Sequence, residues 1–175
     1  MAHPALLGEQ VGDAIRRGVR FLRDAQRPDG SYAGFWGINF TYAIFHVVKS
    51  LRAAGVAASD PALVRAAEWL IGKQKSDGGW GEHYTSCLKD SYVEHPQSQV
   101  VMTSWALLAL MEVVPADSDA VTRGMAWLSG QQGPDGSWPK QAVNGVFFGS
   151  AMLDYRLYKA YFPVWALARF ACRSG

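Results

Sequence analysis

The sequence predicts an all-α fold assembled from repeated αα-hairpins. Three observations carry this prediction: a motif that recurs three times, apolar residues at helical spacing before each copy, and an Asp-Gly turn inside each copy. Units of helix, turn and helix bury their apolar faces by stacking side by side. With 175 residues, 49% of them hydrophobic, the chain is long enough for one domain with a real core.

The repeat keeps the same internal spacing in every copy. An aromatic residue and Leu are followed by Gln and then by Asp-Gly, and an Arg precedes the aromatic residue by four positions. The copies occupy about residues 17–36, 65–84 and 123–141, with these cores: Phe21-Leu22-x-x-x-Gln26-x-x-Asp29-Gly30, Trp69-Leu70-x-x-x-Gln74-x-x-Asp77-Gly78 and Trp127-Leu128-x-x-x-Gln132-x-x-Asp135-Gly136.

Helical periodicity assigns two sets of helices. The helix that ends in each repeat is expected at 11–26, 62–74 and 119–132, and Asp60-Pro61 is a good start for the second. More apolar, inner helices are expected at 39–54, 99–114 and 150–171, the last bent at Pro163. No strand pattern competes with them. The Asp-Gly pairs are interpreted as turns rather than catalytic carboxylates, because Gly tolerates positive φ and Asp bonds the nearby backbone.

Composition excludes several classes of protein. The net charge of +2 comes from mixed signs, which gives no reason to expect nucleic acid binding. No apolar run is long enough to span a bilayer, and residues 1–10 lack the features of a signal peptide. Two cysteines make no disulfide framework, so a reducing, cytoplasmic location is expected. The 22 aromatic residues (seven Trp, seven Tyr, eight Phe) require either a binding site or an unusually aromatic core.

The repeats and the segments between them resemble the triterpene cyclases, and most closely the oxidosqualene branch. Residues 29–42 resemble that branch's DGSWxGxWGxxFTY, and residues 78–92 resemble GGWGExxxSCxxxxY. Residues 97–106 match QSQxxxTxWA, and residues 145–167 match GVF…YxxYxxxFPxWAL. The likeness runs from about residue 9 to residue 171. It implies half of an α/α barrel of the terpene-cyclase type, with 1–175 as a single partial domain.

The resemblance implies an isomerase that cyclises a polyisoprenoid without a cofactor. Carbocations made by protonation are stabilised by aromatic faces in a chamber that excludes water. By family position, the residues expected to line the chamber are Tyr42, Trp105, Phe147 and Tyr155, and His46 and Phe148 join this substrate-binding set where the chain departs from the family pattern. Without the resemblance, aromatic residues at helical spacing are more often core than cavity. The expected ligand is squalene, oxidosqualene or a prenylated arene.

Two residues are candidates for the proton chemistry. At the position of Cys87 the sterol enzymes carry a Cys that tunes the catalytic Asp; the alternative is a small buried hydrophobic residue. Asp154 is a candidate substitute acid if it faces the chamber, because a desolvated carboxyl stays protonated; the alternative is a cap or an ion pair with Arg156 or Lys159.

The family's proton donor lies in a DCTAE or DxDD motif, and neither motif occurs in the 175 residues. We therefore expect a homo- or hetero-oligomer that completes the barrel and brings the acid. The alternatives are a catalytically inactive interaction module and an isoprenoid-binding protein. The family also contacts membranes peripherally through an apolar rim.

No metal site is expected. His83, Cys87 and His95 match no standard zinc spacing, and the Asp, Cys and His zinc set of the related prenyltransferase β-subunits is not found.

Overall fold

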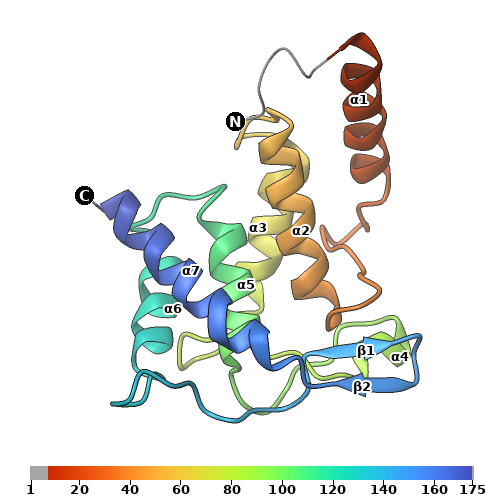
Figure 1. Ribbon diagram of the computed structural model, residues 1–175. Helices are drawn as coiled ribbons and strands as arrows, with labels where there is room; N and C mark the ends of the chain where they lie inside the picture. The colour runs from red at the N-terminus through yellow and green to blue at the C-terminus, as the bar shows by residue number, and fades with distance from the viewer. Residues whose placement is uncertain (1–7, 175) are drawn as a thin grey trace.

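The computed structural model describes residues 8–174 (Figure 1). The long helices are α1 (Glu9–Asp24), α2 (Asn39–Ala53), α3 (Pro61–Gly72), α5 (Val100–Leu110), α6 (Asp119–Ser129) and α7 (Arg156–Ser174). A single turn forms α4 (Ser86–Lys89), and two short strands are β1 (Gly145–Phe147) and β2 (Ala151–Leu153). Within this described range, no helix has both the length and the apolar character needed to cross a membrane.

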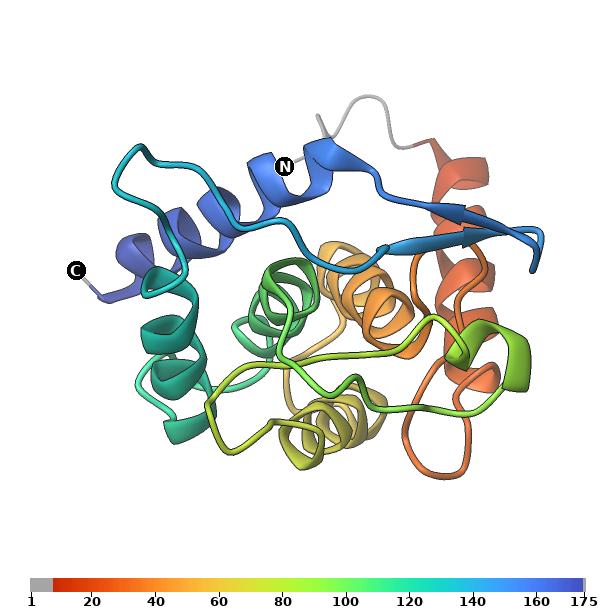
Figure 2. The same cartoon turned by 90° about the horizontal axis from the view of Figure 1, so that it is seen from below.

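The repeat helices α1, α3 and α6 form an outer arc, with α2 and α5 inside it (Figure 2). Helix α7 lies against the other side of α5, which is therefore packed between α2 and α7. All eleven residues of α5 are buried. A helix that is apolar all round is stable only when it is enclosed in this way.

Each repeat turn is bonded to the start of the next outer helix. The side-chain nitrogen of Gln26 donates to the carbonyl of Gly30 in its own turn (3.0 Å) and to that of Ala62 in α3 (2.8 Å). Gln74 repeats the arrangement with Gly78 and with Ala120 of α6, both at 2.8 Å. The glutamine of the motif thus joins neighbouring hairpins.

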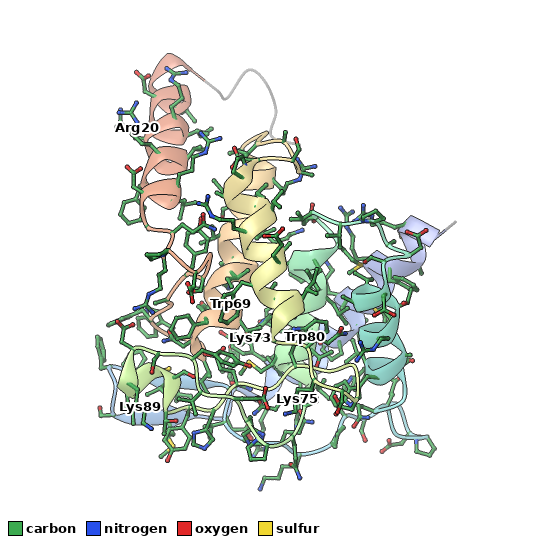
Figure 3. All side chains as sticks on the ribbon, turned by 180° about the vertical axis from the view of Figure 1, so that it is seen from behind. Arg20, Trp69, Lys73, Lys75, Trp80 and Lys89 are labelled. Atoms are coloured by element: carbon green, nitrogen blue, oxygen red, sulfur yellow. The ribbon has the colours of Figure 1, made fainter. Side chains whose placement is uncertain are left out.

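The Asp-Gly pairs are turns, as expected. The carboxylates of Asp29, Asp77 and Asp135 each accept from the backbone N–H two residues on, and the glycine that follows each of them has a positive φ. After the second turn, Trp80 folds back under α3, where its indole N–H donates to the carbonyl of Leu70 at 2.7 Å (Figure 3).

The expectation of a helix over 150–171, bent at Pro163, was wrong at its start, and so was the expectation that no strand competes with the helices. Strands β1 and β2 form an antiparallel hairpin with Val146 opposite Met152, and α7 begins only at Arg156. Left-handed backbone at Phe148 and Gly149 makes the connecting turn, and the N–H of Val146 donates to the carbonyl of Trp36 at 3.1 Å. The segment therefore pairs with a backbone far away in sequence, which helical periodicity does not report. Helix α7 continues through Pro163.

Candidate functional site: an aromatic wall on the inner helices

Aromatic side chains from α2, α5 and α7 make one connected group around Trp105. The Trp105 ring packs edge-on against Tyr42 of α2, with centroids 5.1 Å apart, and against Tyr158 and Phe162 of α7 at 5.6 and 5.5 Å. His46 lies 4.4 Å from Tyr42, and Tyr155 lies 4.7 Å from Tyr158. We call these six residues the Trp105 cluster. It joins four of the six side chains expected to bind substrate.

Trp105 is fully buried at the centre of the cluster. Its indole N–H has no hydrogen-bond partner among the described residues, which is uncommon for a buried donor. The rings around it meet edge to face, the arrangement that aromatic pairs prefer.

Two glycines fix the position of Tyr42. A Cβ atom on Gly37 would lie 2.3 Å from the Tyr42 ring, and one on Gly34 would lie 3.1 Å from it. No real side chain tolerates the first of these distances, so the tyrosine ring occupies space that only glycine leaves free. The Gly34-x-Trp36-Gly37 segment is therefore a positioning element for Tyr42.

Tyr42 and His46, the two polar residues that α2 contributes to the cluster, are both kept uncharged. Burial raises the pKa of the Tyr42 phenol above its ordinary value and lowers the pKa of the His46 imidazole below 6.5. A neutral imidazole can accept a proton, whereas the Trp105 and Phe162 rings of the cluster carry no such base.

An open groove of about 460 Å³ runs beside the cluster between α2 and α7. Phe45 and Trp165 both line it, with ring centroids 5.8 Å apart. Lys49 lines it too, 5.2 Å from the Trp165 ring and 2.8 Å from the Glu112 carboxylate. The lining of the groove is thus largely aromatic and includes one paired charge.

Phe147 and Phe148 are not part of the Trp105 cluster. They pack with each other at 4.3 Å and with Trp36 at 4.3 and 5.8 Å, next to the β-hairpin. Among the described residues, no ring contact connects this second group to the Trp105 cluster. Trp36 is half-exposed here beside a predicted substrate residue, although its motif position assigns it to the turn.

Asp154 lies between β2 and α7 with its side chain exposed. It borders a small recess that also includes Gln99 and Lys159. In the described part of the chain, no ion pair joins it to Arg156 or Lys159. The acid role of Asp154 therefore stays a hypothesis that depends on what else surrounds it.

Cys87 lies in α4, half-buried beside the carboxylate of Glu82. Burial, and then the negative charge of Glu82, raise the pKa of the thiol to about 11, so the protonated form dominates near neutral pH. Glu82 is itself fully buried and accepts from the N–H groups of Phe40 (3.0 Å) and Thr41 (2.9 Å) and from the Thr41 hydroxyl (2.8 Å). These bonds cap the first turn of α2, and burial raises the pKa of Glu82.

The described residues contain no group of three or more side chains that could hold a metal ion. The His83 and His95 rings stack 5.8 Å apart, and each is hydrogen-bonded through Nδ1 within its own loop.

Sequence reasoning missed Tyr158 and Phe162 as site residues. Their spacing from Tyr155, three and seven positions, places all three on one face of a helix. That pattern was visible, but it does not distinguish a face turned to a chamber from one turned to a core.

Comparisons with known proteins point to one family. Residues 5–172 match the sequence model of the squalene-hopene cyclase C-terminal domain. Lanosterol synthase erg7A of Aspergillus fumigatus is 40% identical over 99% of this chain and 23% of its own length. The squalene–hopene cyclase of Bradyrhizobium diazoefficiens is 41% identical over 95% of this chain and 26% of its own length. The chain thus spans about a quarter of these relatives.

A solved structure shows the same fold. It is a variant of the type II terpene cyclase MstE from Scytonema in complex with its substrate geranylgeranyl dihydroxybenzoate, with a TM-score of 0.72 and 20% identity. The match covers 94% of this chain and 52% of that one. The likeness confirms the predicted fold class.

Proposed function

Because the chain belongs to the squalene-hopene cyclase C-terminal domain family, we propose that it forms part of the chamber wall of a class II terpene cyclase and binds a polyisoprenoid there. The observation that carries the proposal is the Trp105 cluster. It presents aromatic rings from α2, α5 and α7 that meet edge to face, with no charged side chain among its members.

Such a wall suits cation chemistry. Aromatic faces stabilise a carbocation electrostatically without forming a bond to it, as charged or strongly nucleophilic groups would. Tyr42 and His46 are uncharged near neutral pH for the reasons given above, so neither adds a fixed charge to the wall. Phe147 and Phe148 would contact a different part of the same ligand, since they lie at the hairpin.

The proton that starts cyclisation is proposed to come from outside the wall. A second set of helices, in a partner chain or a second copy, would close the chamber and desolvate its acid. Asp154 is the candidate for a substitute acid within this chain, and Cys87 could tune the acidity of a carboxyl only if that carboxyl is brought to it.

The alternative is an isoprenoid-binding protein without turnover. The exposure of Asp154 favours it, because an exposed carboxylate is not desolvated as a proton donor would be. Binding and turnover therefore need separate measurements.

The test is to incubate the purified chain with oxidosqualene and squalene, alone and with lysate of the source organism. Binding is followed by tryptophan fluorescence and product by mass spectrometry. We expect saturable binding, weakened about tenfold by Tyr155→Ala, which removes an exposed ring of the cluster, and unaffected by the control Leu88→Ala. Product only with lysate would identify a missing acid partner.

Loss of the product after Asp154→Asn would instead identify the substitute acid. The proposal fails if neither compound binds under any of these conditions, or if Leu88→Ala weakens binding as much as Tyr155→Ala does.

The cellular location is part of the proposal. We place the protein in the cytoplasm, in peripheral contact with a membrane through apolar side chains at the hairpin such as Phe148 and Met152, which are exposed.

A further inference from the structure

Helix α1 and the third repeat turn lie at the two ends of the outer arc. They carry the two complementary halves of one set of contacts, called here the bonding unit. This unit occurs twice inside the chain, between α1 and α3 and between α3 and α6. In each case the glutamine of a turn donates to a carbonyl three residues before the arginine of the next outer helix. That arginine bonds back, Arg65 to the side-chain oxygen of Gln26 and Arg123 to the carbonyls of Lys75 and Ser76.

Close packing accompanies these bonds. A Cβ atom added to Gly30 would lie 2.8 Å from the carbonyl oxygen of Arg65, and one added to Gly78 would lie 2.7 Å from that of Arg123. Trp69 donates its indole N–H to Asp29 at 3.2 Å and is only 8% exposed. Each glycine turn is thus sealed by the arginine and the aromatic residue of the following helix.

The third turn supplies the glutamine half of the bonding unit, but no following outer helix in the described chain supplies the arginine and the aromatic residue. Gln132 donates only to Gly136 of its own turn, at 3.0 Å. The nearest atom to a Cβ on Gly136 would be the Gln132 side-chain nitrogen at 3.9 Å, so the contact that closes the other two turns is missing. The turn is open to solvent.

Helix α1 supplies the arginine and the aromatic residue of the bonding unit, but no glutamine turn among the described residues packs on it. Phe21, the counterpart of Trp69, is 70% exposed. Arg17, the counterpart of Arg65 and Arg123, is exposed and makes no hydrogen bond within residues 8–174. The carbonyl that a docking glutamine would reach is that of Ala14, three residues before Arg17.

We propose that a second copy of this chain docks head to tail, with the third turn of each copy on α1 of the other. The sequence unit on both surfaces is the one that already joins α1 to α3 and α3 to α6, so the same contacts can form between copies. Two such junctions close a ring of six hairpins, and a heterologous contact that closes makes a finite assembly.

This inference rests on the proposed function, because the ring would enclose the two Trp105 clusters as one chamber. Ligand binding is the expected property of the ring, whether or not turnover follows.

The first test is the mass of the chain in solution by light scattering or sedimentation. We expect a dimer of 19.2 kDa subunits, weakened more than about tenfold by Gly136→Ala, because an added methyl group blocks the close approach seen at Gly30 and Gly78.

The matched control is Gly55→Ala. Gly55 also has a positive φ, +84° against +80° at Gly136, and it too has open space around it. The Gly55→Ala variant should therefore have the same backbone strain as Gly136→Ala and still form the dimer. A monomer at all concentrations would overturn the proposal, and so would equal effects of the two variants.

The second test is cross-linking, which also determines the orientation. At an internal junction, the Arg123 guanidinium donates to the carbonyl of Ser76 in the preceding turn at 3.3 Å, and the counterpart of Ser76 in the third turn is Pro134. In a Cys172→Ser background, chains with Arg17→Cys should therefore cross-link to chains with Pro134→Cys through a short dithiol-reactive reagent when the two are mixed. Neither variant should cross-link to itself, and Gly55→Cys should not react with Arg17→Cys.

Self-linking of Arg17→Cys would show that α1 of one copy contacts α1 of the other, and it would overturn the proposal. Failure of docking remains distinguishable from failure of the proposed function, because binding of squalene or oxidosqualene is measured separately, with and without lysate.

Discussion

At the scale of single residues, the wall depends on where glycine leaves room for a ring. Gly37 is such a position, since it lies against Tyr42 with no space for a Cβ atom. We expect Gly37→Ala to destabilise the fold by about 1–3 kcal/mol, the usual range for overpacking, and to displace Tyr42 from Trp105. In a Tyr42→Ala background the same change should cost little, because the clashing ring is gone. Urea unfolding of the four proteins of this cycle measures the coupling; additive effects would contradict it.

His46 is the histidine of the Trp105 cluster. Its folded-state pKa lies below the unfolded value of 6.5 because burial disfavours the imidazolium. The unfolded state therefore binds more protons, and stability is expected to fall as the pH drops below about 6.5. The NMR titration of the His46 ring gives its pKa directly. His46→Phe should remove this part of the pH dependence, and a ring that titrates above 6.5 would contradict the prediction.

At the scale of elements, the glutamine of each repeat links one hairpin to the next. Gln74 makes two hydrogen bonds, one within its turn and one to α6, whereas Gln132 makes only the first. We expect Gln74→Ala to lower the free energy of unfolding by about 1–3 kcal/mol and Gln132→Ala by less than about 1 kcal/mol. Helix circular dichroism in urea, at protein concentrations where the chain is monomeric, checks both. Equal losses of unfolding free energy in the two variants would show that the hydrogen bond to the next helix does not stabilise the fold.

Helix α5 is the element that holds the wall together, since α2 and α7 both pack on it. It lacks a side-chain cap of its own at Gln99, and the first N–H of the helix, that of Val100, donates to the side chain of Gln141 at 2.6 Å. Helix α2 is capped in the same distant way by Glu82. The loops between repeats thus position the inner helices that carry Tyr42 and Trp105.

At the scale of the whole molecule, stability is expected to depend on protein concentration. Docking of a second copy stabilises only the folded state, so the apparent Tm should rise by about 5–10 °C between about 1 and about 100 µM. Gly136→Ala should flatten this dependence and Gly55→Ala should not. Differential scanning calorimetry across that range measures it, and a constant Tm would speak against an assembly.

The sequence by itself determined the all-α class, the three repeats and the turns, because these depend on local periodicity and on what Asp and Gly do to the backbone. Gln26 and Gln74 were visible as motif residues in the same way. The resemblance to the cyclases also indicated Tyr42, Trp105 and Tyr155 as residues of one surface, and three elements bring these three together.

Only the tertiary structure decided the rest. The β-hairpin forms because the 145–147 segment finds the backbone of Trp36 and Gly37 about a hundred residues away, a pairing that leaves no local signature. Phe147 and Phe148 fall outside the Trp105 cluster for the same reason. The open third turn and the exposed face of α1 are likewise properties of packing: the motif is the same in every copy, and only its neighbours in space distinguish a sealed turn from an open one.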